Sequence, residues 1–396
     1  MVRHPSGGAE GGARQDPALT PAQARLLLSG PGREAVATAG RQDLALTGRL
    51  AAAEAMRSAA GPELGPLALQ QALLRERARA KHPRGAELWW TGEALEQATS
   101  YDVAVHRARR FRGPVLDLCC SVGGDLLALP EGSIGVDLDE ARLLLAAENA
   151  RVLGRRIHLV RADVTTMEPR GDVFADPARR SGGRRVFDAR AYTPPLDAVL
   201  AWRPRSLGVK VAPGIDWAVV PAHLETEVVS LRGEVKEAVL WGGQARQGSA
   251  RSATLLPSGA VLTDLAVPAP QVRPVGRWLL EPDGAVVRAQ LVAQVAHAVG
   301  GGLLDATIAY VTADQRLPTP FGTWYEVLDV VPFGIKRLRE VLRGHDAGPL
   351  VVKKRGTAVT PEVLSRQLGM TGSRVVTVVL TRAAGAQIAL VVRREP

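Results

Sequence analysis

The segment Val115-Leu-Asp-Leu-Cys-Cys-Ser-Val-Gly-Gly-Asp125 decides the fold of this 396-residue chain. Its first four residues predict a buried strand, in which Asp117 is the one charged residue. The small residues that follow predict a sharp turn, and residues 126–129 predict a helix after it. Because such a turn carries little side-chain bulk, a ligand can lie directly against its backbone.

A second short strand, Ser133-Ile-Gly-Val-Asp137, also ends in a carboxylate. Ligands of open parallel sheets bind at the carboxyl ends of the strands, and an acid about 20 residues after a glycine turn suits two ribose hydroxyls. The G-x-G-x-x-G spacing of a pyrophosphate site is absent, and Asp125 would repel a phosphate. The pattern favours a nucleoside with a positive centre, such as S-adenosylmethionine. A turn that binds another nucleotide, or nothing, is the alternative.

Strands and helices continue to alternate as far as Trp241. Further strands are expected at residues 156–160, 171–175 and 207–211, and helices at residues 140–153 and 195–202. This alternation predicts an α/β fold with a mostly parallel, Rossmann-like sheet that is covered on both faces. Residues 227–231 and 236–241 predict an antiparallel hairpin that closes the sheet.

The segment around Asp117 resembles the first motif of class I S-adenosylmethionine-dependent methyltransferases, D-x-x-C-G-x-G-G-D in many RNA-modifying members. Ser121 stands where most members have glycine. The resemblance implies that Asp137 binds the ribose and that Asp163, after the third strand, binds the adenine amino group. The candidate cofactor-binding residues are Asp117, Cys119, Cys120, Ser121, Gly123, Gly124, Asp137, Leu138, Asp163 and Val164.

The segment Asp176-Pro177-Ala178-Arg179-Arg180 follows the fourth expected strand. Methyltransferases of base amino groups carry Asp/Asn-Pro-Pro and an aromatic residue there, so the resemblance implies that Asp176 and Pro177 are catalytic. The acid would accept a hydrogen bond from the amine of a flipped base, on which the ring stacks. Ala178 replaces the second proline of this motif, and Arg179 replaces its aromatic residue. The segment therefore does not decide whether the methyl acceptor is an exocyclic amine. A structural turn before Pro177 is the alternative.

Two basic clusters are candidate contacts to RNA phosphates. One is the arginine-rich loop after Pro177, and the other lies at the end of an expected strand near residue 353. The candidate substrate-binding residues are Arg179, Arg180, Lys353, Lys354 and Arg355. For both clusters the alternative is a solvated basic surface.

Composition points in the same direction. The net charge of +10 suggests a polyanionic partner, and residues 325–396 hold twelve Lys and Arg against six Asp and Glu.

No apolar run is long enough to span a membrane, and the seven histidines lack metal-ligand spacing, so neither a membrane nor a metal partner is expected. The adjacent cysteines, 119 and 120, exclude an ordinary disulfide framework and indicate the cytoplasm. The oligomeric state stays open.

The chain divides into five expected parts. Residues 1–15 are rich in Gly and Arg and predict a disordered tail. Thr20-Pro21-Ala22-Gln23 predicts a capped helix start. The further parts are an α-helical region at 16–111, the methyltransferase core at 112–244, a connecting region with a hairpin and a helix at 245–324, and a small α/β domain at 325–396.

The last part carries a second resemblance. Val330-Val-Pro-Phe333, Lys353-Lys-Arg-Gly356 and Leu380-Thr-Arg382 are similar to the THUMP-like C-terminal domain of a bacterial methyltransferase family. By analogy the resemblance implies RNA binding. We therefore expect a methyltransferase that acts on an rRNA or tRNA base, with the last domain as an RNA clamp. A small-molecule methyltransferase and a cofactor- or RNA-binding protein without catalysis are the alternatives.

Overall fold

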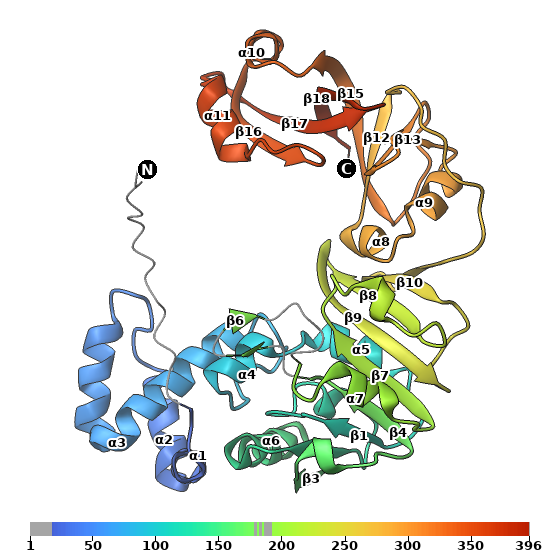
Figure 1. Ribbon diagram of the computed structural model, residues 1–396. Coiled ribbons are helices and arrows are strands. Elements are labelled where there is room, and N and C mark those ends of the chain that lie inside the picture. Colours follow the sequence, from blue (N-terminus) through green and yellow to red (C-terminus); the bar gives the residue numbers. More distant parts are fainter. Residues whose placement is uncertain (1–17, 178–179, 182–183, 186–191, 396) are drawn as a thin grey trace, which may run out of the picture. The chain divides into compact units, whose positions relative to one another are not determined.

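The computed structural model describes residues 18–177, 180–181, 184–185 and 192–395 (Figure 1). The chain divides after Arg205 into two compact units, and each unit has its own core. No helix among the described residues has the length and apolar character needed to cross a membrane.

The first unit begins with five helices: α1 (Pro21–Leu28), α2 (Gly30–Ala39), α3 (Arg49–Ala78), α4 (Gly92–Gln97) and α5 (Tyr101–Ala108). Thr20 caps α1 in a capping box with Gln23, as the sequence predicts. The long helix α3 kinks at Gly61, whose φ of 80° lies outside the helical region, directly before Pro62.

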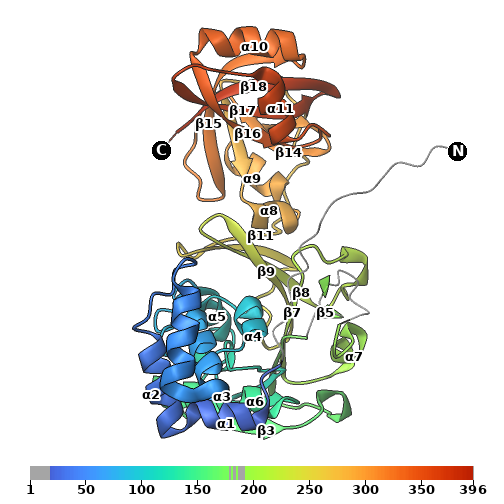
Figure 2. The same cartoon turned by 90° about the vertical axis from the view of Figure 1, so that its left-hand side faces the viewer.

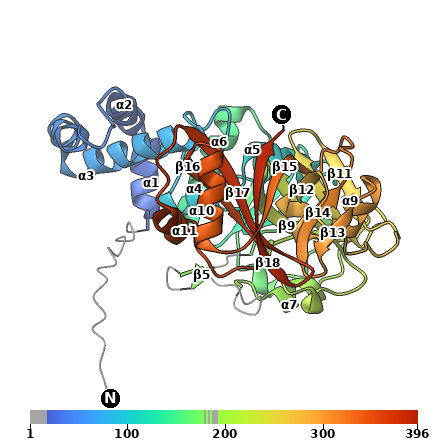
Figure 3. The ribbon, with the colours of Figure 1, turned by 90° about the horizontal axis from the view of Figure 1, so that it is seen from above.

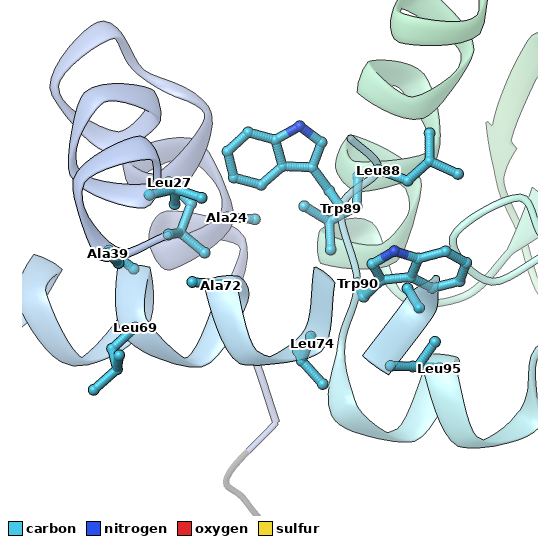
Figure 4. Packing of buried hydrophobic residues seen from close by; sticks show 14 of the residues in the cluster. Ala24, Leu27, Ala39, Leu69, Ala72, Leu74, Leu88, Trp89, Trp90 and Leu95 are labelled. Carbon is cyan, nitrogen blue, oxygen red and sulfur yellow. The ribbon is translucent and has the colours of Figure 1, made fainter. Parts of the chain in front are cut away.

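Helices α1 to α4 share a core with α6 (Glu140–Leu153), against which α1 packs (Figure 2). Trp89 and Trp90 are the largest side chains of this core and are 1% and 4% exposed. Figure 4 shows Trp89 facing Ala24 and Leu27, whereas Trp90 lies over Leu95. The tryptophan pair is therefore a packing element and leaves no free ring for stacking a base.

Four parallel strands form the sheet of the first unit, in the order β4-β1-β2-β3. The strands are β1 (Val115–Leu118), β2 (Ile134–Asp137), β3 (His158–Arg161) and β4 (Asp172–Ala175). They are connected by short 3-10 helices, η1 (Leu126–Ala128) and η2 (Val164–Thr166), and by α6. The helix expected at residues 126–129 is thus a single 3-10 turn. Beyond β4 lie β5 (Arg180–Ser181), β6 (Arg184–Arg185) and α7 (Leu196–Ala201).

The second unit opens with five strands in the order β7-β9-β8-β10-β11. They are β7 (Ser206–Val211), β8 (Glu225–Leu231), β9 (Glu234–Gly243), β10 (Arg251–Leu256) and β11 (Ala260–Thr263), with η4 (Trp217–Val219) after β7. β9 runs antiparallel to both β7 and β8, which confirms the closing hairpin. Its turn, Arg232-Gly233, has two positive φ angles, as a two-residue hairpin requires.

A second sheet of seven strands follows, in the order β13-β14-β12-β15-β18-β17-β16. The strands are β12 (Trp278–Pro282), β13 (Gly302–Asp305), β14 (Ile308–Ala313), β15 (Gly322–Pro332), β16 (Ala347–Lys354), β17 (Arg374–Ala383) and β18 (Ala386–Arg394). Helices α10 (Ile335–Gly344) and α11 (Pro361–Leu368) pack beside β16 (Figure 3). The two helices bury their apolar faces there through Leu338, Leu342, Leu364 and Leu368.

The prediction of a single helix in the connecting region is wrong. Two short helices, α8 (Gly284–Arg288) and α9 (Val292–Ala298), occupy this segment. Gln290 has a φ of 60° and breaks the helix between them. The apolar periodicity continues through the break, so the sequence pattern does not reveal it.

Candidate functional site

The turn after β1 holds two non-glycine residues in the left-handed backbone region. Cys119 has a φ of 67° and Ser121 a φ of 51°, and Gly123 follows at 90°. A side chain in this region costs on the order of 1 kcal/mol, so surrounding contacts must hold the turn. The amides of Cys119 and Cys120 both donate to the carbonyl of Val136, at 2.9 and 3.0 Å. The end of β2 therefore fixes the shape of the turn.

Glycines on both sides of this turn allow close approach. A Cβ on Gly135 in β2 would lie 2.8 Å from Sγ of Cys120, so the thiol packs where another residue would have a side chain. A Cβ on Gly124 would lie 3.9 Å from that of Ala98. The connection between α4 and α5 consequently lies close to the turn.

Asp137 is a buried acceptor at the end of β2. Its Oδ2 accepts from the amide of Ser121 at 2.8 Å, and its Oδ1 accepts from the amide of Asp139 at 2.9 Å. Each carboxylate oxygen has a second lone pair, which leaves capacity for ribose hydroxyls. The neighbouring Leu138 is 63% exposed and so is open to a ligand.

Asp117 is the most unusual side chain of the site. It is 1% exposed, and neither carboxylate oxygen has a hydrogen-bond partner among the described residues. Burial, together with the nearby carboxylates of Asp125 and Asp176, raises the pKa of Asp117 well above its usual value. A buried carboxyl group of this kind is normally satisfied, so its two open oxygens are compatible with a cationic ligand. The site therefore fits the sulfonium and ammonium charges of S-adenosylmethionine.

A buried arginine from the helical region contacts the same turn. Nη1 of Arg107 in α5 lies 2.6 Å from Oδ1 of Asp125, and its guanidinium lies 4.4 Å from the ring centroid of Phe174 in β4. Oγ1 of Thr99 donates to Oδ2 of Asp125 at 3.3 Å. Arg107 has no distinguishing signal in the sequence, because the Arg-rich segment around it has the composition of an ordinary helix surface.

Asp163 lies after β3, as expected, but its carboxylate is directed to its own turn. Oδ1 accepts from the amide and the hydroxyl of Thr165, at 2.9 and 2.7 Å. The hydroxyl and then the amide of Thr165 lower the pKa of Asp163, which is exposed. Val164, the next residue, is buried. The adenine contact of Asp163 therefore stays a prediction.

Asp176 and Pro177 directly follow β4. The amide of Asp176 donates to the carbonyl of Leu118 at 3.3 Å, which places it beside the end of β1. The carboxylate of Asp176 is near enough to raise the pKa of both Asp117 and Cys119. Pro177 is buried. The sheet thus brings the two predicted catalytic residues next to the turn after β1, residues 119–125, which we call the cofactor turn.

The basic candidates differ from one another. Arg179 lies outside the described residues, and of Arg180 the structure describes the backbone, in β5. Lys353 donates to Oε2 of Glu281 at 2.6 Å, and Nη1 of Arg355 donates to the carbonyl of Ala309 at 2.6 Å. Lys354, by contrast, is exposed at the end of β16. Two of the three residues in the second cluster are therefore held by internal contacts.

Burial favours the protonated form of both thiols in this turn. Burial, followed by the neighbouring carboxylate of Asp137, raises the pKa of Cys119, and burial does the same for Cys120. Only a thiolate is an effective nucleophile of this kind.

Across the described ranges, including this site, no group of three or more His, Cys, Asp and Glu is arranged to hold a metal ion.

Comparison with known proteins decides the family. Two relatives from Mycobacterium tuberculosis, strains H37Rv and CDC 1551, are each 42% identical over 339 residues, which cover 82% of this chain and 94% of the relative. Both are named uncharacterized S-adenosylmethionine-dependent methyltransferases. The chain belongs to this methyltransferase family. S-adenosylmethionine is accordingly the cofactor of the methyltransferase, as the sequence analysis predicts; the residues that bind it stay a prediction.

Two further comparisons support the architecture of the methyltransferase. A solved structure of a candidate methyltransferase from Porphyromonas gingivalis W83 has a TM-score of 0.69 and 22% sequence identity, covering 85% of this chain and 92% of that chain. At this identity the similarity shows the fold, and it confirms the predicted α/β class. The family model described as THUMP domain-like matches residues 322–394, which confirms the second resemblance.

Proposed function

We propose that the methyltransferase transfers a methyl group to a base of rRNA or tRNA, with its THUMP-like domain contacting the RNA. The observation that carries the proposal is the position of Asp176 and Pro177 beside the end of β1, next to the cofactor turn. The similarity of residues 322–394 to THUMP domains and the basic character of that domain support RNA as the substrate class.

Each part of the proposed site has a separate role. Asp137 accepts hydrogen bonds from the ribose, and the turn between Cys119 and Gly124 lies along the methionine moiety. Asp117 provides a negative charge for the cationic part of the cofactor. When bound, S-adenosylmethionine supplies an electrophilic methyl group with a good leaving group. The protein's main contribution is therefore to position the nucleophile and to exclude water.

Asp176 orients the acceptor base in this proposal. Its carboxylate accepts a hydrogen bond from an N–H of the nucleophilic nitrogen, and this bond fixes the direction of the nitrogen lone pair. The same carboxylate receives the proton that the nitrogen loses when it is methylated. Pro177 fixes the backbone directly after it. The neutral thiols of Cys119 and Cys120 argue against the cysteine-dependent chemistry that methylates carbon 5 of pyrimidines.

Comparison of RNA from three strains tests the proposal. Nucleosides are prepared from rRNA and tRNA of a wild-type strain, a deletion strain and the deletion strain that carries the Asp176→Ala gene. We expect one methylated nucleoside to be absent from the last two strains and present in the first. Identical nucleoside profiles in all three would exclude rRNA and tRNA as substrates and would favour a small-molecule acceptor.

A further inference from the structure

We propose that Asn149 is a positioning residue for S-adenosylmethionine: from helix α6 it holds the backbone of the cofactor turn in the conformation that binds the cofactor. This inference rests on the cofactor site of the proposed function, and it does not depend on the nature of the methyl acceptor. It assigns part of that site to a single buried amide on a helix.

Both polar atoms of the Asn149 side chain are used in bonds to backbone groups. The residue is 1% exposed. Its Nδ2 donates to the carbonyl of Val122, in the cofactor turn, at 3.0 Å. The same Nδ2 donates to the carbonyl of Trp89, and Oδ1 accepts from the amide of Trp89. An amide nitrogen has two hydrogens, so each carbonyl receives one of them. One side chain therefore joins the cofactor turn to the tryptophan pair.

The cofactor turn needs contacts of this kind because its backbone is strained. Cys119 and Ser121 have positive φ angles, of 67° and 51°, which cost free energy in residues that carry a side chain. The end of β2 accepts hydrogen bonds from the amides of residues 119–121 and so holds the first part of the turn. The bond from Asn149 holds the turn at the next residue, Val122.

Val122 is the point at which the turn is attached to the helical core. Its side chain is 2% exposed and packs in the same cluster as Trp89. The next residue, Gly123, has a φ of 90°, and glycine adopts either sign of φ at little cost. The peptide group between Val122 and Gly123 is therefore able to rotate once its carbonyl loses the bond to Asn149. A rotated peptide changes the backbone surface against which the cofactor lies.

Gln71 in α3 provides an internal comparison. It is 2% exposed, and it bonds to the backbone of Trp90 much as Asn149 bonds to that of Trp89. In the amide orientation that gives each atom a complementary partner, Gln71 accepts from the amide of Trp90 at 3.2 Å and donates to its carbonyl at 2.9 Å. Neither bond reaches the cofactor turn. The two amides thus have the same role for neighbouring tryptophans, and Asn149 has one additional bond to the turn.

Calorimetric titration of two matched variants with S-adenosylmethionine tests the proposal. Asn149→Leu and Gln71→Met each replace a buried amide by an apolar side chain of similar size, so both should lower the melting temperature. At a temperature at which both variants are folded, we expect Asn149→Leu to bind the cofactor at least tenfold more weakly than the wild type. Gln71→Met should bind within twofold of it. A tenfold loss means that the binding conformation of the turn is populated about one time in ten.

Hydrogen exchange of residues 119–125 without cofactor provides a local measurement. Exchange in this segment should be faster in Asn149→Leu than in the wild type, and saturating S-adenosylmethionine should slow it. In Gln71→Met it should match the wild type. If either variant does not fold, Asn149→Ala and Gln71→Ala take their places, because they leave space for water at the backbone groups, and the same differences are expected.

Two results would overturn the proposal. One is an affinity for S-adenosylmethionine that falls equally, or not at all, in the two variants. The other is exchange of residues 119–125 that is the same in Asn149→Leu and the wild type. Failure of the underlying cofactor site would appear separately, as unchanged affinity in Asp137→Ala. Failure of the RNA substrate would appear as a wild type that binds the cofactor but transfers no methyl group to RNA.

Discussion

The side chain of Asn149 in α6 holds the backbone of Trp89 from both sides. Its Oδ1 accepts from the amide of Trp89 at 2.7 Å, and its Nδ2 donates to the carbonyl of Trp89 at 3.0 Å. The same Nδ2 donates to the carbonyl of Val122, in the cofactor turn, at 3.0 Å. The helical region is therefore bonded to the turn through Asn149, Arg107 and Thr99. We regard this region as part of the cofactor site.

Ser121→Gly should stabilise the protein. Ser121 has a φ of 51°, and its Oγ is buried without a partner among the described residues. Glycine removes both penalties, and we expect a gain of about 1 kcal/mol in the free energy of unfolding. Denaturant unfolding measures it, and Ala384→Gly, at a φ of 46° in the hairpin between β17 and β18, is the control that should stabilise without affecting the cofactor. A destabilised Ser121→Gly variant would show that the hydroxyl has a required contact.

Asp117→Asn should increase stability more at alkaline pH than at acidic pH. In the folded protein the pKa of Asp117 is raised, mainly by burial, so folding favours its protonated form. This contribution is complete below the pKa of the unfolded chain and is lost as the pH rises through the folded value. The amide cannot ionise and so avoids the loss. Melting temperatures at pH 5 and pH 8 measure the effect, and a gain that is equal at both pH values would contradict a raised pKa.

Asp137→Ala should weaken cofactor binding substantially. It removes a buried charged acceptor that also holds the amide of Ser121, at a cost of about 1.5–3 kcal/mol, or roughly 10- to 150-fold in affinity. Calorimetry with S-adenosylmethionine measures the loss. Asp163→Ala is the paired variant, and its smaller expected effect reflects the exposed position of the carboxylate on its own turn. Unchanged affinity of the Asp137→Ala variant for S-adenosylmethionine would show that Asp137 does not bind the cofactor.

Lys354→Gln should alter RNA binding without altering the fold. Lys354 is exposed, whereas Lys353 is bonded to Glu281. Neutralising one phosphate contact flattens the plot of log affinity against log salt by about 0.7 on single-stranded RNA. Titration of labelled RNA at several salt concentrations measures this slope. Lys353→Gln should instead lower the melting temperature, and equal slopes for wild type and Lys354→Gln would make this cluster a solvated surface.

The sequence was sufficient for strands β1 and β2 and for the turn after β1, but not for β12, β13 and β14, which lie in the region where it predicts only a hairpin and a helix. Apolar runs that end in Asp117 and Asp137 predict both strands and the ligand edge, because the side chains that matter lie within the motif itself. Arg107 and Asn149 were not predictable in this way. Each acts on the turn from a helix that is distant in the chain, and a single buried polar residue leaves no periodic signal. The internal contact of Lys353 likewise depends on Glu281, 72 residues before it.

The most direct measurement is transfer of a tritiated methyl group from S-adenosylmethionine into RNA from a deletion strain, by wild-type protein and by Asp176→Ala. We predict incorporation by the wild type, loss of at least a hundredfold in turnover for Asp176→Ala, and cofactor affinity that differs by less than threefold. An interaction made mainly in the transition state has this signature. Equal turnover in both proteins would reduce Asp176 to a turn residue. A wild type that binds the cofactor but labels no RNA would contradict the account.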